Sequence, residues 1–290
     1  MSYAATIGFF DGVHQGHRFL LDSLCQVAHT HSLATMAVTF TEHPQTVLHG
    51  TAPHLLTSLD ERISLLKKAG VDEVTVLDFS AIHNLQAQAF MLWLKQRYNV
   101  TLLLMGYDHR FGSDHINNIS DYQRLGQEID VEVVLAPPMP NRQVSSSVVR
   151  QAVSDGRIEE ADSLLGRAYT LTGIVTHGKG LGKTIGFPTA NISLTDTRRL
   201  LPKDGVYAVT VDNGTTMSAK WAVANIGTNP TVGGEERTIE VHILGFQGSL
   251  YGSTLTLRFL YRLRNEQTFT SIEALKQQIG RDIQSLRTKM

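Results

Sequence analysis

The sequence predicts an α/β fold followed by an all-β fold: a doubly wound parallel sheet in the first half, then a small antiparallel β-barrel with a terminal helix. In the first half, short apolar runs of strand length alternate with segments whose apolar residues recur at helical spacing. After about residue 165 this spacing disappears, and β-rich segments separated by glycine turns continue to about residue 270. The change of pattern predicts two domains, residues 1–160 and 161–290.

The composition is that of a globular soluble protein. The chain has 290 residues, of which 42% are hydrophobic and 18% charged. A net charge of -1 excludes a broad basic surface, so no nucleic-acid partner is expected. The single cysteine cannot form an intrachain disulfide, and we find neither a signal peptide nor an apolar run long enough to span a membrane. We therefore expect a cytoplasmic protein without a membrane partner, and predict no particular oligomeric state.

The elements of the first half follow from their apolar patterns. Strands are expected at residues 3–10, 33–40, 71–79, 100–105 and 131–135. The strand at 100–105 is apolar throughout, as a central parallel strand would be. Helices are expected between the first two strands, after the capping box that begins at Ser58, over residues 87–98, and near 121–128.

The second half reads as one more helix followed by a barrel. The helix is expected over residues 158–165, and the strands at residues 168–176, 206–212, 218–226, 238–246 and 254–263. A second capping box, residues 270–273, predicts the start of a terminal helix. Ile272, Leu275, Ile279 and Ile283 share one face of this helix, which should pack on the barrel.

A tight glycine turn joins the first strand to the first helix. Glycines at positions 8, 12 and 16 would let the backbone approach a ligand closely. The free N–H groups at a helix N-terminus suit phosphate. His14 in the turn and His17 at the helix start would add two donors for phosphate oxygens. The alternative is an ordinary strand–helix turn with two surface histidines.

Two further polar segments of the first half are candidate nucleotide contacts. After the strand at 100–105, Asp108 could accept a hydrogen bond from a ribose or an amide, and Arg110 could hold phosphate. The alternative is a polar loop with an internal Asp–Arg pair. Ser146, Ser147 and Arg150 could form a compact anion site at a helix start, although the hydroxyls could equally cap that helix.

The second half has a glycine-rich segment that resembles a phosphate-binding loop, with Gly178, Gly182 and Lys183 as candidate phosphate contacts. His177 stands where a Walker A motif needs glycine, and no helix is expected to follow, because residues 186–188 read Gly-Phe-Pro. We therefore reject a P-loop NTPase and keep a glycine-rich flap over phosphates.

Three polar residues of the second half suit phosphoryl transfer. Thr189 and Asn191 lie two residues apart, so their side chains share one face of an extended segment. Neutral oxygens of this kind, together with nucleotide phosphates, suit Mg²⁺. Glu266, just after the last strand, is a candidate general base for a hydroxyl. The alternatives are an Asn/Thr turn and a solvated glutamate.

The His-x-Gly-His pattern after a first strand resembles the signature of the HIGH nucleotidyltransferase superfamily, and the whole chain resembles the bacterial bifunctional riboflavin kinase/FAD synthetase family. The motifs similar to the FMN adenylyltransferase module are Gly8 with Phe10–His17, Thr39–Phe40 with His43–Pro44, Gly106 with Asp108 and Arg110–Gly112, and Ser145–Ser147 with Arg150. Those similar to the riboflavin kinase module are Gly186–Asn191, Leu201–Pro202 with Gly205–Tyr207, Asn225–Thr228 with Pro230–Thr231, Leu250–Gly252, and Arg264 with Glu266 and Phe269.

The resemblance implies a Rossmann-like nucleotidyltransferase domain, a barrel of the riboflavin kinase type, and two reactions. The barrel would transfer the γ-phosphate of ATP to riboflavin, giving FMN; the first domain would transfer AMP from a second ATP to FMN, giving FAD and pyrophosphate. Thr189 and Asn191 would hold Mg-nucleotide, and Glu266 would take the hydroxyl proton. His14 and His17 would contact phosphates in the first domain. Asp108, Ser146, Ser147 and Arg150 would help bind and orient ATP there. Beside these implied contacts, we expect nucleotide contacts at Gly8, Phe10, Asp11, Gly16 and Arg110 in the first domain, and at Gly178, Gly182 and Lys183 in the barrel.

The sequence departs from the family pattern in one loop. His109 replaces the usual phenylalanine, and residues 113–117, usually glycine-rich and basic, read Ser-Asp-His-Ile-Asn. Asp114 in a loop that faces phosphate would weaken ATP binding. Two alternatives therefore stand beside the bifunctional enzyme. One is a riboflavin kinase with a weak or inactive adenylyltransferase half, and the other is a flavin-binding regulator without turnover.

Overall fold

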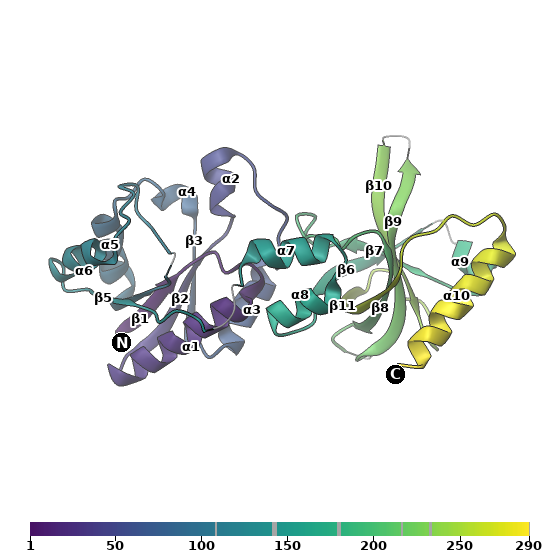
Figure 1. Cartoon of the computed structure of the whole chain (residues 1–290), viewed down its shortest axis with the longest axis horizontal. Helices are drawn as coiled ribbons and strands as arrows, with labels where there is room; N and C mark the ends of the chain where they lie inside the picture. The colour runs from purple at the N-terminus through teal and green to yellow at the C-terminus, as the bar shows by residue number, and fades with distance from the viewer. Residues whose placement is uncertain (108, 141–143, 179–180, 216, 232–233, 290) are drawn as a thin grey trace. The chain divides into compact units, whose positions relative to one another are not determined.

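The structure consists of two compact units, Met1–Ser146 and Ser147–Met290 (Figure 1). It is a computed structural model, and it describes residues 1–107, 109–140, 144–178, 181–215, 217–231 and 234–289. The side chains of residues 181, 183, 229–231 and 234–236 are outside this description. Among the described residues, no helix is both long and apolar enough to cross a membrane.

The first unit is built on a five-stranded sheet in the order β3-β2-β1-β4-β5. All four neighbouring pairs are parallel, which confirms the predicted doubly wound sheet. The strands are β1 (Tyr3–Ile7), β2 (Ala34–Phe40), β3 (Glu73–Leu77), β4 (Val100–Met105) and β5 (Glu132–Leu135). Each lies within its predicted range.

The helices of this unit cover both faces of the sheet. They are α1 (Gln15–Thr30), α2 (Pro44–His49), α3 (Leu59–Lys68), α4 (Phe79–Ile82), α5 (Ala87–Tyr98) and α6 (Ile119–Gln127), preceded by a 3-10 turn, η1 (Asp11–Val13). The predicted capping box at Ser58 is present at the start of α3. The sequence analysis missed α2 and α4, because four to six residues are too few to show helical spacing.

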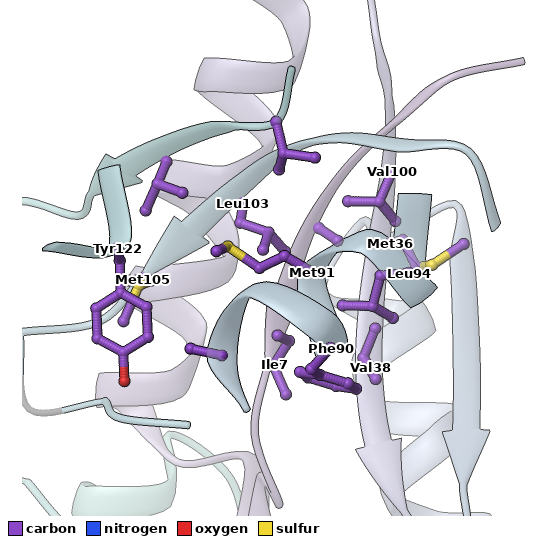
Figure 2. Close-up of a cluster of buried hydrophobic side chains, with 14 of the residues drawn as sticks. Ile7, Met36, Val38, Phe90, Met91, Leu94, Val100, Leu103, Met105 and Tyr122 are labelled. Atoms are coloured by element: carbon purple, nitrogen blue, oxygen red, sulfur yellow. The ribbon is translucent and has the colours of Figure 1, made fainter. Parts of the chain in front are cut away.

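The side chains of the central strand β4 are divided between two hydrophobic cores, one on each face of the sheet. Val100, Leu103 and Met105 of β4 join the core beneath α5 and α6 (Figure 2), and Leu102 and Leu104 of the same strand join the core beneath α1. Both faces are therefore buried, which explains the continuous apolar run of this strand. Burial on two faces makes the sheet a rigid base for the loops at its carboxyl edge.

The second unit is a closed antiparallel barrel in the order β10-β7-β6-β11-β8-β9. Its strands are β6 (Thr170–Thr176), β7 (Ala190–Leu194), β8 (Gly205–Asp212), β9 (Lys220–Thr231), β10 (Gly234–Ile243) and β11 (Thr254–Arg264). Two helices, α7 (Ser146–Ser154) and α8 (Ile158–Leu165), precede it. The predicted antiparallel barrel is confirmed. The sequence analysis missed β7, a five-residue strand directly after a proline-containing turn.

Two helical details of this unit correct the sequence analysis. A one-turn helix, α9 (Leu181–Thr184), lies within the glycine-rich segment, where no helix was expected. The terminal helix α10 (Ile272–Arg287) begins one residue later than the predicted capping box requires: Ser271 is its N-cap and accepts from the Ala274 N–H. A threonine followed by a serine offers two adjacent caps, and the sequence does not choose between them.

Helix α10 is fastened to the barrel by apolar contacts and one ion pair. Leu286 is fully buried in a cluster with Val206 and Val223 of the neighbouring strands. The Nε–H of Arg264, at the end of β11, lies 3.0 Å from both carboxylate oxygens of Asp282. The prediction that α10 packs on the barrel is confirmed, and its first turns form one wall of the cavity described below.

Candidate active sites

The glycine turn after β1 has an unusual backbone. Gly12 has a φ of 79°, as a tight turn requires of glycine. Phe10 and Val13 also have positive φ, 55° and 38°, which is uncommon for residues with a side chain. A Cβ on Gly8 would lie only 3.0 Å from the Phe10 ring. Strain of this kind is characteristic of functional sites, where the surrounding structure maintains it.

The two predicted histidines meet at the start of α1. His14 is the N-cap of the helix: its Nδ1 accepts from the His17 N–H at 3.3 Å, so the proton of the neutral ring is on Nε2. The two rings stack at 3.7 Å between centroids. Burial, followed by the neighbouring His14, lowers the pKa of His17 well below its usual value, so His17 is neutral at pH 7. The pair can offer neutral N–H donors to a phosphate.

The motif carboxylate Asp11 is turned into the protein. It is 2% exposed, and it accepts from the backbone N–H groups of Leu56 and Thr57 at 3.0 and 3.1 Å and from the Thr57 hydroxyl at 3.1 Å. The Thr57 hydroxyl in turn accepts from the Gly12 N–H. Asp11 therefore fixes the shape of the turn, and its carboxylate is occupied by these donors.

The loop after β4 also uses its charged residues internally. The Arg110 guanidinium donates to three loop carbonyls, those of Tyr107, His109 and Asn117, at distances from 2.7 to 3.2 Å. Asp114 accepts from the Ala87 N–H at 3.0 Å and so caps α5. Asp108, predicted to contact the nucleotide, lies outside the described residues.

The serine motif lies at the start of α7. Ser146 is the last residue of the first unit, and its hydroxyl donates to the carbonyl of Asp11 at 2.9 Å. Ser147 and Arg150 belong to the second unit, and their predicted contact with ATP stays a prediction.

A cavity of about 410 Å³ in the second unit collects the predicted kinase residues. Thr189, Asn191 and Glu266 border it, together with Asn225 of the family motif and with Glu240, which the sequence analysis did not single out. Glu240 on β10 pairs with Asn191 on β7 and with Asn225 on β9. The barrel register thus places an amide on either side of one carboxylate.

Short contacts hold the polar side chains of this cavity. The Thr189 hydroxyl donates to Glu240 Oε2 at 3.2 Å. Two glycines allow the glycine-rich segment to approach: a Cβ on Gly178 would lie 2.0 Å from Asn191 Nδ2, and one on Gly182 would lie 3.1 Å from Thr189 Oγ1. Gly178 and Gly182 therefore lie against the predicted metal ligands. The side chain of Lys183 lies outside the described part of the chain.

Glu266 occupies a different part of the same cavity. It lies against Gly227, where a Cβ would be 2.0 Å from Glu266 Oε1, and it is more exposed than the half-buried Glu240. Partial burial, and then the nearby Asp204 carboxylate, raise its pKa above the usual value, while a hydrogen bond from Asn225 opposes the shift. Three carboxylates therefore border the cavity: Glu240, Glu266 and Asp282, which is paired with Arg264.

Apolar side chains line two neighbouring cavities of the second unit. Phe187, Phe269, Leu275 and Ile279 contribute apolar walls to the cavity that holds Glu240 and Glu266. A second cavity of about 480 Å³ also includes Thr189, and it is lined by Val175, Phe246 and Tyr251. The Tyr251 ring stacks on His177 at 4.0 Å between centroids. Thr189 is therefore shared by two cavities that could each take a ring system.

The oxygen atoms around Thr189 fit a magnesium ion shared with phosphates. A hydroxyl, an amide oxygen and a carboxylate lie on adjacent elements, and Mg²⁺ usually binds one or two protein oxygens, phosphates and water. The described residues contain no group of three or more His, Cys, Asp or Glu side chains that could hold a metal by themselves. The donor set thus suits Mg²⁺ that arrives with a nucleotide.

The parallel sheet with its histidine turn and the barrel with its threonine-centred cavities define a two-domain protein that handles nucleotides. Comparison with known proteins specifies the class. Residues 2–148 match the family model of FAD synthetase, and residues 165–290 match that of riboflavin kinase. The chain belongs to the bifunctional riboflavin kinase/FMN adenylyltransferase family.

Individual relatives are similar over nearly their full lengths. The bifunctional riboflavin kinase/FMN adenylyltransferase of Escherichia coli K12 is 39% identical over 96% of this chain and 89% of its own. That of Haemophilus influenzae is 36% identical over 98% of this chain and 93% of its own. A crystal structure described as a macrolide-efflux protein from Streptococcus pneumoniae has a TM-score of 0.89 and 35% identity, covering 99% of this chain and 94% of that one. The fold of both units is therefore shared by a solved structure.

Proposed function

We propose that this chain phosphorylates riboflavin to FMN and then adenylylates FMN to FAD, with ATP as the donor in both steps. Its membership of a family whose relatives are named for both activities supports the pair of reactions. The observation that carries the kinase half is the contact of the Thr189 hydroxyl with Glu240 where two cavities meet. A cytoplasmic location and the absence of nucleic-acid and membrane partners stay predictions.

In the kinase step, the two cavities would hold the two substrates. Riboflavin suits the cavity with the aromatic and aliphatic walls of Phe187, Phe269 and Ile279. The adenine of ATP suits the cavity beside Tyr251. Thr189 would then lie between the γ-phosphate and the ribityl hydroxyl. Thr189 and Asn191 would hold the magnesium ion, which neutralises phosphate charge when bound.

One carboxylate must accept the proton of the ribityl 5′-hydroxyl as its oxygen bonds to the γ-phosphorus and ADP leaves. Glu266 was predicted for this role, and its raised pKa suits a base. The position of Glu240 supports it as the stronger candidate, because it contacts Thr189 directly and lies beside Asn191. Glu266 would then bind and orient the flavin.

In the adenylyl transfer step, an oxygen of the FMN phosphate would attack the α-phosphorus of ATP and pyrophosphate would leave. No proton transfer is needed, so positioning and charge stabilisation would supply the rate. His14 Nε2–H and the His17 ring would donate to the phosphates at the start of α1. Asp11 and Arg110 would hold the turn and the loop in shape around the nucleotide.

Product analysis tests the proposal directly. The protein is incubated with riboflavin, ATP and Mg²⁺, and separately with FMN, ATP and Mg²⁺, and the flavins are separated by chromatography. FAD from both mixtures is expected. FMN without FAD would identify a kinase with an inactive first unit, and unchanged riboflavin and ATP would identify a flavin-binding protein without turnover.

A matched pair of variants assigns the base. Glu240→Gln and Glu266→Gln each remove one charge and keep the size of the side chain. We expect Glu240→Gln to lower kcat of riboflavin phosphorylation about a hundredfold or more, and Glu266→Gln to raise KM for riboflavin with a smaller effect on kcat. The opposite pattern would return the base role to Glu266. Conversion of FMN to FAD serves as the internal control and should stay unchanged in both variants.

A further inference from the structure

His242 holds the turn that carries Thr189. Its Nδ1 lies 2.9 Å from the carbonyl oxygen of Pro188. A carbonyl can only accept a hydrogen bond, so Nδ1 carries the proton and the neutral ring takes the Nδ1–H tautomer. The ring also borders the cavity that holds Glu240 and Glu266, and it meets Phe187 edge-on, at 5.6 Å between centroids.

His242 and Glu240 act on neighbouring residues of the turn from one strand. They are two residues apart on β10, so they lie on the same face, and Val241 between them is buried on the opposite face. Glu240 accepts from the Thr189 hydroxyl while His242 donates to the Pro188 carbonyl. One strand face therefore holds the turn at two consecutive positions.

The contact with Pro188 fixes the orientation of the peptide group that joins Pro188 to Thr189. The Pro188 carbonyl and the Thr189 N–H belong to one planar peptide group. Proline has no N–H, so its carbonyl is its only backbone group available for a hydrogen bond. On the other side of the turn, Gly186 has a φ of 88°, and the Phe187 N–H donates to the Gly182 carbonyl at 2.8 Å. His242 thus holds the peptide group that leads into Thr189, while Glu240 holds the Thr189 hydroxyl itself.

We propose that His242 is a positioning residue for phosphoryl transfer: through the Pro188 carbonyl it sets the Thr189 hydroxyl between the γ-phosphate of ATP and the acceptor hydroxyl. This inference rests on the proposed kinase function. Misplacement of a positioned group by about 1 Å can cost about a hundredfold in rate. Loss of the contact should therefore lower kcat more than it changes substrate binding.

Three substitutions separate the hydrogen bond from ring packing. His242→Asn keeps an N–H donor at the position of Nδ1, His242→Phe keeps a ring without a donor, and His242→Ala removes both. We expect kcat of riboflavin phosphorylation to fall about tenfold or more in His242→Phe and His242→Ala. His242→Asn should keep at least a third of the wild-type value. KM for riboflavin and for ATP should change less than threefold in His242→Phe.

Each outcome has a defined meaning. Equal losses in all three variants, or a loss in His242→Ala alone, would overturn the proposal, because the donor would then not matter. A fall in riboflavin affinity without a fall in kcat would make His242 a flavin contact instead. Thermal unfolding reports whether the second unit of each variant is folded, and FMN adenylylation by the first unit controls for the amount of protein. A wild-type protein that does not phosphorylate riboflavin would refute the proposed function itself, a result distinct from a failure of the variants.

Discussion

The two units use their motif residues in different ways. In the first unit, Asp11, Arg110 and Ser146 make their hydrogen bonds to the chain itself and shape a backbone turn and a loop. In the second, Thr189 and Asn191 border a cavity; the barrel register aligns Asn191 with Glu240, and the Thr189 hydroxyl donates to the same carboxylate. A motif can therefore mark residues that shape the backbone in one domain and residues that line a cavity in another, and only the structure separates the two cases.

The largest effect that would test this difference is expected at Asp11. Asp11→Ala leaves three buried donors from Leu56 and Thr57 without their acceptor, at about 1–3 kcal/mol each. The first unit should lose about 3 kcal/mol or more of stability and its FAD synthesis, while riboflavin phosphorylation continues. Thermal unfolding and the two activity assays measure this. Asp22→Ala, at an exposed position on α1, is the control, and full FAD synthesis by Asp11→Ala would contradict a scaffold role.

His17 tests the opposite case, a side chain of the first unit expected to contact the ligand. His17→Ala should lower the rate of FMN adenylylation about a hundredfold, the usual cost of removing one positioned donor. Riboflavin phosphorylation by the second unit should not change. His29→Ala, at an exposed position in the last turn of the same helix, controls for a general effect of removing histidine. An unaltered adenylylation rate would remove His17 from the site.

A smaller effect is expected at Asp114, the residue that departs from the family pattern. Because it caps α5 at the Ala87 N–H, Asp114→Ala should destabilise the first unit by about 1 kcal/mol. Asp114→Asn keeps an acceptor oxygen and should be nearly neutral. KM for ATP in FAD synthesis should be unchanged in both. A severalfold fall of that KM in Asp114→Asn would show that the carboxylate repels the phosphates after all.

The smallest effect concerns pH and the second unit. Burial raises the pKa of Asp162 to about 7, although its Oδ1 accepts from the Tyr169 N–H at 2.7 Å and Arg167 opposes the shift. Because the folded protein binds this proton more tightly than the unfolded chain, protonation of Asp162 stabilises the fold. This contribution is complete below pH 3.8, the pKa of the unfolded chain, and it is lost as the pH rises through about 7. The gain in melting temperature from Asp162→Asn should therefore grow between pH 5 and 8. A gain that does not depend on pH would show that Asp162 does not titrate there.

Most of the fold could be predicted from the sequence, because its signals are local. Periodicity located the strands and long helices, and the composition of β4 indicated burial on two faces. Short elements such as α2, α9 and β7 escaped because they span too few residues for a period to show. The predicted N-cap of α10 was one residue too early, because Thr270 and Ser271 are adjacent candidate caps.

The site was predicted less completely, because its second half depends on cross-strand neighbours. Thr189 and Asn191 were found from their spacing, which the extended β7 now accounts for. Glu240 and His242 were missed, and Asn225 was named in a family motif without a role, since the register that brings β10 beside β7 and β9 is a property of the closed barrel. One signal was present: Glu240 and His242 alternate with apolar residues, which marks a polar strand face.

The alternation along β10 also limits how the protein can change in length. Inserting or deleting one residue ahead of Glu240, with strand pairing kept, would exchange the two faces of the strand. Val241 would then face the cavity that now holds Glu240 and His242, and these two polar side chains would take the buried position of Val241. An insertion of two residues would restore the faces and displace Glu240 only along the strand. Changes of length within the paired part of β10 should therefore be tolerated only in pairs of residues.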